Sequence, residues 1–368
     1  MLFFKYFHIE KCTESYLIKR LSEVIKRTTY SVICEYSSQC IFFCCYFSYK
    51  QLRRPGTMTY GDCIEENKFT LHSQVRVPIL IHHGLLSSSA DWVLLGPNKA
   101  LAYLLCDSGY DIWLGNARGN AYSRKHKQYT TKDKEFWDFS WHEIGYYDLP
   151  ATIDYILEQT GYTELYYVGY SQGTTAFYVM ASERSEYNRK IKGVVNLAPI
   201  AFLSNQRSPL LKLVVHFYGL TKSFCMGWFY LIAGFGSDQL DKSMLPLILG
   251  HFPAGSSAKQ IIHYSQSIIS GSFRKFDYGA TENLNIYGST QPPKYDLEKV
   301  KTPIVIFYSD NDFLTDPADV KKLVARLPNV IETRKIEYSK FNHIDYLWGR
   351  DARTLLYNAV LGVLKKFR

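Results

Sequence analysis

One five-residue segment, Gly169-Tyr170-Ser171-Gln172-Gly173, constrains the fold of this chain more than any other feature. The apolar run before it, ELYYVGY, is typical of a buried strand, and the run after it, QGTTAFYVMAS, is typical of a helix. A strand that passes directly into a helix needs a very tight turn, which strains the serine and exposes its hydroxyl. The two glycines leave room for the strand and the helix to approach each other there.

The same alternation of strand and helix recurs along the chain. Predicted strands lie at 77–84, 110–116, 164–170, 191–199, 303–312 and 333–338, and predicted helices at 98–106, 149–160, 172–182, 316–327 and 352–367. We expect Gly161 to end one helix and Asp316 to cap the start of another. Such repetition predicts an α/β fold: a mostly parallel central sheet with helices on both faces. Functional groups should then gather at the carboxyl ends of the strands.

Residues 201–275 interrupt this rhythm with two strongly apolar runs, LLKLVVHFYGL and GWFYLIAGF. We interpret the segment as a helical cap or lid inserted over an apolar site. Core helices are one alternative. A membrane span is another, although polar residues keep each run below the ~20 residues that a span needs. Residues 76–200 and 276–368 would form the α/β core, and residues 1–75 show no clear period.

Charge and cysteine content argue against several classes of function. The formal net charge is +9, and residues 1–54 hold nine Lys and Arg against four Glu. Elsewhere both signs are interspersed, and no basic run follows an aromatic platform, so nucleic-acid binding has little support. Six of the eight cysteines fall in the first 63 residues, without CxxC or Cys/His ligand spacing. We therefore expect neither a metal nor an organic cofactor.

The N-terminus, MLFFKYFHIEKC, makes a poor signal peptide because Lys5 breaks its apolar stretch and Glu10 ends it. The later IFFCCYF run is too short to span a bilayer. From these residues alone, secretion has no support.

A serine hydroxyl becomes a good nucleophile only when a base removes its proton, and that base is usually a histidine oriented by a carboxylate. In folds of this kind the chain order is serine, acid, histidine. Downstream of Ser171 lie His216, His251, His263 and His343. Only His343, within FNHIDYLW, follows the last predicted strand, whereas the other three lie in the predicted cap. We therefore predict His343 as the general base.

Four aspartates follow the strand PIVIFY and could supply the acid. Asp316 precedes a proline and has the pattern of a helix N-cap, and Asp319 falls in the first helical turn. Asp310 and Asp312 remain at the carboxyl end of the strand. The pattern alone leaves both open and favours Asp312 only slightly.

Stabilising a tetrahedral oxyanion takes two preorganised N–H donors. One is predicted to be the backbone N–H of Gln172, the residue after the nucleophile. The other should come from a loop after an early strand, and His83-Gly84-Leu85-Leu86 has that position, so the N–H of Leu85 is the candidate. We interpret His83 itself as a structural turn residue rather than a catalytic one.

Together these residues resemble the acid lipases, the family that includes the gastric and lysosomal acid lipases. Eight segments carry the resemblance, in the family's order across about residues 76–368: HHGLLSSSADW, GYDIWLGNARGNAYSRKH, FWDFSWHEIGYYDLPATIDYI, YVGYSQGTT, NLAPIA, FPAGSSAKQIIHY, YSDNDFLTDPADV and FNHIDYLWGRDA. The resemblance implies the α/β-hydrolase fold and hydrolysis of triacylglycerols or steryl esters beneath a cap. It also implies Ser171 as nucleophile, Asp312 rather than Asp310 as acid, and His343 as base. The oxyanion donors it implies are Leu85 and Gln172.

The resemblance implies a lipid ester at a lipid–water interface as the partner, no stable membrane span, and a secreted or lysosomal location. The chain departs from the family's pattern in residues 1–75 and in a cap that is shorter between Pro199 and Pro253. Cap and lid shape the acyl pocket, so two other hypotheses stay open. One is a carboxylesterase for short soluble esters, and the other is a catalytically impaired lipid-binding protein.

Overall fold

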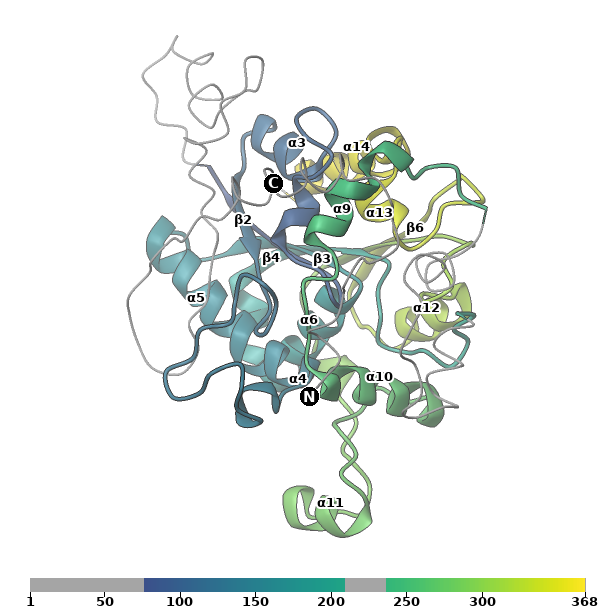
Figure 1. Cartoon of the computed structure of the whole chain (residues 1–368). Helices are drawn as coiled ribbons and strands as arrows, with labels where there is room; N and C mark the ends of the chain where they lie inside the picture. The colour runs from purple at the N-terminus through teal and green to yellow at the C-terminus, as the bar shows by residue number, and fades with distance from the viewer. Residues whose placement is uncertain (1–75, 209–235, 368) are drawn as a thin grey trace, which may run out of the picture.

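A parallel six-stranded sheet forms the centre of the molecule, in the computed structural model, which describes residues 76–208 and 236–367 (Figure 1). Its strands are β1 (Pro78–His82), β2 (Asp111–Gly115), β3 (Leu165–Tyr170), β4 (Ile191–Leu197), β5 (Ile304–Tyr308) and β6 (Val330–Lys335). They lie in the order β2-β1-β3-β4-β5-β6, and each neighbouring pair is parallel. The predicted α/β class and the parallel sheet are confirmed.

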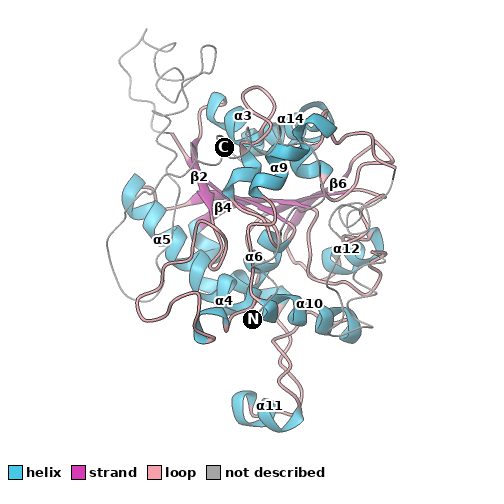
Figure 2. Ribbon diagram, viewed as in Figure 1, coloured by secondary structure: helices cyan, strands magenta, loops and turns pink. Residues whose placement is uncertain are grey.

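Helices cover both faces of this sheet, as Figure 2 shows. The α-helices are α3 (Leu101–Asp107), α4 (Trp141–Glu143), α5 (Leu149–Thr160), α6 (Gln172–Glu183), α9 (Leu245–His251), α10 (Ala258–Ser270), α11 (Ala280–Tyr287), α12 (Pro317–Val324), α13 (Asp345–Trp348) and α14 (Asn358–Lys366). Short 3₁₀ segments are η2 (Ser89–Trp92), η3 (Glu135–Trp137), η5 (Ser185–Lys190), η6 (Lys242–Met244) and η7 (Leu297–Lys299). Two π-helical turns, η4 (Ile144–Asp148) and η8 (Arg353–Tyr357), lead into α5 and α14.

The two faces of the sheet carry separate apolar cores, because successive side chains of a strand point to opposite sides. In β3, Tyr167 belongs to the core beneath α5 and α6, and Tyr166 and Val168 belong to the core beneath α3 and α14. Every residue of β3 is buried, as expected for a central strand of a parallel sheet. Burial on both faces explains why β3 appears in the sequence as a continuous apolar run.

Most predicted elements lie within a few residues of the observed ones. Gly161 ends α5 in the left-handed region at φ 71°, and the Asp316 side chain accepts the Ala318 N–H at the start of α12, so both predicted caps are confirmed. The last strand was predicted at 333–338 but runs from Val330 to Lys335. The start of β6 is set by its pairing with β5, in which Ile304 lies opposite Val330. The local sequence does not indicate this register.

Of the predicted cap, residues 201–208 and 236–275 are described, and they contain α9 and α10. The apolar runs 210–220 and 227–235 lie outside the described residues, as does the segment 1–75, so the domain boundaries stay predictions. After α10, an arm bridged between Arg274 and Lys294 carries α11 at its tip, away from the body (Figure 1). Within the described ranges, no helix combines the length and apolarity needed to cross a membrane.

Close packing of η4 against α6 leads to a stability prediction at Gly145. A Cβ at this position would lie 2.5 Å from Ala176 O and 2.6 Å from the Val179 Cβ, both parts of a buried helix. We expect Gly145→Ala to lower the free energy of unfolding by about 1–3 kcal/mol, measured by denaturant titration. Gly362→Ala is the control, because Gly362 lies in α14 with nothing within 4 Å of an added Cβ. This variant should gain about 0.5–1 kcal/mol in free energy of unfolding. Equal stability of the two variants would contradict the packing argument.

Candidate active site

Ser171 lies at the turn between β3 and α6 with φ 50° and ψ −116°, a conformation that residues with a Cβ rarely adopt. Its neighbours hold it there: Ser171 N donates to Leu197 O at 3.0 Å, and the Thr174 hydroxyl donates to Ser171 O at 2.6 Å. A Cβ on Gly173 would lie 2.5 Å from His82 O, so only glycine fits between the start of α6 and the end of β1. The tight, strained turn predicted for this segment is present.

Three side chains from distant parts of the chain form one line of hydrogen bonds at this turn. Nε2 of His343 lies 2.9 Å from Ser171 Oγ, and Nδ1 of His343 lies 2.7 Å from Asp312 Oδ2. Ser171 is 5% exposed, His343 4% and Asp312 0%. A carboxylate can only accept, so the ring proton sits on Nδ1 and the lone pair of Nε2 faces the serine hydroxyl.

Of the four aspartates after β5, only Asp312 reaches His343. Its Oδ1 accepts the N–H groups of Leu314 at 2.9 Å and Thr315 at 2.8 Å, which leaves Oδ2 directed at the imidazole. Asp310 points to the surface and pairs with Lys335 at 3.1 Å. Asp316 caps α12, and Asp319 accepts hydrogen bonds from Asn205.

The loop that carries His343 is held by hydrogen bonds to side chains that the sequence analysis did not identify. The Tyr170 hydroxyl donates to His343 O at 2.7 Å. The Asp345 carboxylate accepts the Asn342 N–H at 2.8 Å and the Ser237 hydroxyl at 2.6 Å. Burial raises the pKa of Asp345 to about 6. The sequence offers one signal for Asp345, its position two residues after His343 in FNHIDY. It offers none for the contact between Asp345 and Ser237.

The two predicted oxyanion donors come from different elements. Gln172 is the first residue of α6, so its N–H has no intrahelical acceptor. Leu85 follows Gly84, where an added Cβ would lie 3.2 Å from the Cβ of Ser171. Both backbone segments therefore adjoin the serine.

The side chain of Gln172 makes a contact that sequence reasoning missed. Its amide donates to Gln260 Oε1 on α10, and Gln260 Nε2 donates to Ser256 Oγ at 2.6 Å. Gln172 is 3% exposed and Gln260 2%. Part of the predicted cap thus packs directly against the residue that follows Ser171.

The other histidines considered for the base have local partners. His251 lies 2.9 Å from the Tyr122 hydroxyl. His263 contacts Ser140 Oγ at 3.0 Å and Arg274 O at 2.9 Å, and burial lowers its pKa to about 3. His216 lies outside the described residues.

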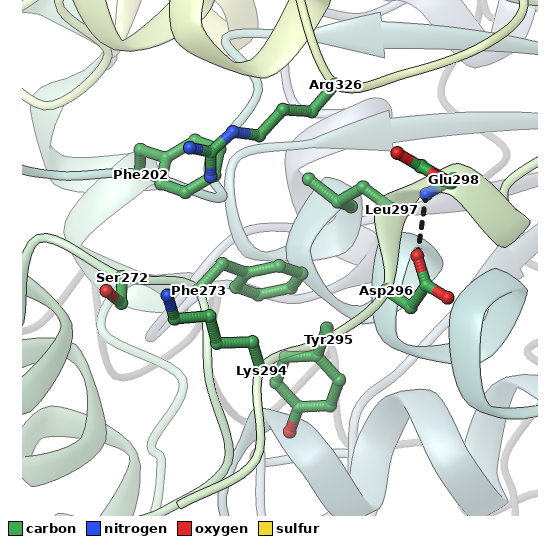
Figure 3. A pocket seen from close by; sticks show the side chains of 9 residues that line it. All are labelled: Phe202, Ser272, Phe273, Lys294, Tyr295, Asp296, Leu297, Glu298 and Arg326. Atoms are coloured by element: carbon green, nitrogen blue, oxygen red, sulfur yellow. Dashed lines mark hydrogen bonds between the residues drawn. The ribbon is translucent and has the colours of Figure 1, made fainter.

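A cavity of about 360 Å³ is lined by other residues, which Figure 3 shows. Most of the side chains that line it are aromatic or charged: Phe202, Ser272, Phe273, Lys294, Tyr295, Asp296, Leu297, Glu298 and Arg326. None of them belongs to the hydrogen-bonded line at Ser171. Among the described residues, no three His, Cys, Asp or Glu side chains gather as a metal site requires.

Known proteins share this fold. Residues 77–222 match the family model described as the alpha/beta hydrolase fold. The solved structure of a soluble variant of monoglyceride lipase from Saccharomyces cerevisiae superposes with a TM-score of 0.53 at 16% identity, covering 80% of this chain and 88% of that one. The chain therefore has the α/β-hydrolase fold, as predicted.

Similarity in sequence narrows this class to one family. Lipase 3 of Drosophila melanogaster is 41% identical over 81% of this chain and 84% of its own length. Lipase 1 of the same organism is 41% identical over 80% and 73%. Human gastric triacylglycerol lipase is 34% identical over 79% and 80%. The chain belongs to the acid lipase family, which includes the gastric lipases, and it is an enzyme that hydrolyses lipid esters.

Proposed function

We propose that Ser171, His343 and Asp312 are the nucleophile, general base and orienting acid of this hydrolysis. The line of hydrogen bonds from Asp312 Oδ2 through His343 to Ser171 Oγ is the observation that carries the proposal. It places the lone pair of Nε2 against the hydroxyl proton that must be removed.

The reaction then proceeds through an acyl-enzyme in two steps. Ser171 Oγ attacks the ester carbonyl while His343 Nε2 takes its proton, and the proton passes to the departing alcohol. Water, deprotonated by His343, attacks the acyl carbonyl of this intermediate. The bond to Ser171 Oγ then breaks, His343 returns the proton to Oγ, and the fatty acid is released. In both steps the N–H groups of Leu85 and Gln172 stabilise the negative charge on the carbonyl oxygen.

For the substrate, we propose a triacylglycerol or steryl ester met at a lipid–water interface. The similarity to proteins named triacylglycerol lipase supports the first of these. The same relatives, described as gastric lipases, support a secreted or lysosomal location.

Substrate preference separates a lipase from a carboxylesterase. We expect the rate on a triacylglycerol to rise steeply once its concentration passes the solubility limit, and long-chain esters in emulsion to be hydrolysed. A pH-stat titration of released fatty acid measures both. Simple saturation by dissolved short-chain esters, with no response to an emulsion, would instead support the carboxylesterase hypothesis.

A fluorophosphonate probe tests the proposed nucleophile directly, because it reacts covalently only with an activated serine. Mass spectrometry of the labelled peptide should place the phosphonyl group on Ser171. A folded sample that stays unlabelled would favour the impaired lipid-binding protein.

A further inference from the structure

The Gly84–Leu85 peptide lies beside the nucleophile in a turn whose backbone is unusual. An added Cβ on Gly84 would come within 3.0 Å of the Tyr170 ring and 3.2 Å of the Ser171 Cβ. Leu86, two residues on, has φ 62°, in the left-handed region. Such a conformation persists only where surrounding contacts hold it, so the contacts of this turn determine the orientation of the Gly84–Leu85 peptide.

The ring of His83 is bonded on both sides, and one side is this peptide. Its Nδ1 lies 2.7 Å from Gly84 O, and its Nε2 lies 3.0 Å from Ala117 N. A backbone N–H can only donate, so Nε2 is the acceptor and Nδ1 carries the proton that Gly84 O receives. His83 is 3% exposed, and burial lowers its pKa to about 4, which keeps the ring neutral at neutral pH.

A second layer of side chains, from the loop after β2, holds the ring in turn. Asn120 Nδ2 lies 3.1 Å from His83 Nε2 and donates to Asn116 Oδ1 at 2.9 Å. Asn116 also accepts the Ser89 N–H at 3.0 Å and donates to the Ser89 hydroxyl at 3.0 Å. The loop after β2 therefore forms hydrogen bonds with both ends of the segment from His83 to Ser89.

From this geometry we infer that His83 is a positioning residue of the oxyanion hole. In a trans peptide the C=O and N–H point in opposite directions, so a bond that fixes Gly84 O also fixes the direction of the Leu85 N–H. Gly84 O also accepts the Ser87 N–H, but at 3.3 Å. Without the shorter bond from His83, the peptide could rotate and present its carbonyl oxygen, which repels an oxyanion. The inference rests on the proposed function, which assigns the Leu85 N–H to the oxyanion, and it gives His83 a task beyond that of a turn residue.

Two substitutions separate the two bonds of the ring. Asn has its amide nitrogen at the position of Nδ1, so His83→Asn can keep the donor to Gly84 O. Gln reaches the position of Nε2 instead, so His83→Gln can keep the acceptor for Ala117 N but loses the donor. We expect His83→Gln to lower kcat about 10²–10³-fold with little change in KM, the effect of losing one oxyanion donor. The loss of kcat in His83→Asn should be at least about tenfold smaller than that in His83→Gln.

His263→Gln is the matched control. This imidazole is also buried and bonded at both nitrogens, but to Ser140 and Arg274, away from the turn at Ser171. We expect its melting temperature to fall while kcat stays within about twofold of wild type.

Each outcome decides the inference. Unchanged kcat in His83→Gln, or equal losses in both His83 variants, would mean that the ring only supports the fold. If neither variant folds, Asn120→Ala takes their place: it frees one side of the ring and should lower kcat about tenfold at constant KM, and unchanged kcat would overturn the inference. Fluorophosphonate labelling of wild-type Ser171 is measured alongside, because its absence would refute the proposed function rather than the role of His83.

Discussion

Ser171→Ala is expected to lower kcat on a long-chain ester by about 10⁶-fold and to leave KM nearly unchanged. The variant keeps the turn between β3 and α6 but removes the oxygen that His343 Nε2 faces at 2.9 Å. Without Oγ no acyl-enzyme forms, and the activity left over comes from binding and oxyanion stabilisation alone. Release of fatty acid from an emulsified triacylglycerol measures the loss.

Ser182→Ala provides the control on the same helix. Ser182 is buried at the other end of α6, and its hydroxyl donates to Val179 O at 3.1 Å. We expect its kcat to match wild type. Turnover in Ser171→Ala comparable to that of Ser182→Ala would rule out the proposed nucleophile.

Asp312→Asn is expected to lower kcat about 10⁴-fold without unfolding the protein. The N–H groups of Leu314 and Thr315 point at Oδ1, so the new amide must place its oxygen there and its NH₂ toward His343. Nδ1 then has to accept, the ring proton moves to Nε2, and the imidazole can no longer take a proton from Ser171. A pre-steady-state burst assay with a chromogenic ester should show slow acylation.

Asp310→Asn is the matched comparison, two residues away on the same loop. Asp310 is exposed, and its pairing with Lys335 at the surface contributes little. We expect its kcat to stay within about twofold of wild type. If Asp310→Asn were the more damaging change, the proposed acid would be the wrong aspartate.

Much of the fold was accessible from local sequence. Continuous apolar runs marked β1, β3 and β4, because each is buried on both faces of a parallel sheet. The strained turn at Ser171 could be predicted because its glycines and the flanking strand and helix are all adjacent in the chain. Sequence order then pointed to His343, and resemblance to a family pointed to Asp312.

Contacts between distant segments left no comparable signal. The hydrogen bond between Gln172 and Gln260 joins residues that are 88 positions apart in the sequence. The hydrogen bond between His83 and Asn120 joins residues that are 37 positions apart. Neither glutamine nor asparagine carries a pattern that identifies its partner.

By itself, the sequence determined the type of fold, the turn that presents Ser171 and the order of the proposed nucleophile, acid and base. Those features follow from periodicity and from neighbours along the chain. Only the tertiary structure decided which oxygen of Asp312 faces His343, what holds the loop of His343, and how His83 fixes the Gly84–Leu85 peptide. The physical reason is that hydrogen bonds are directional over about 3 Å, and such distances between remote residues exist only once the sheet has brought its strand ends together.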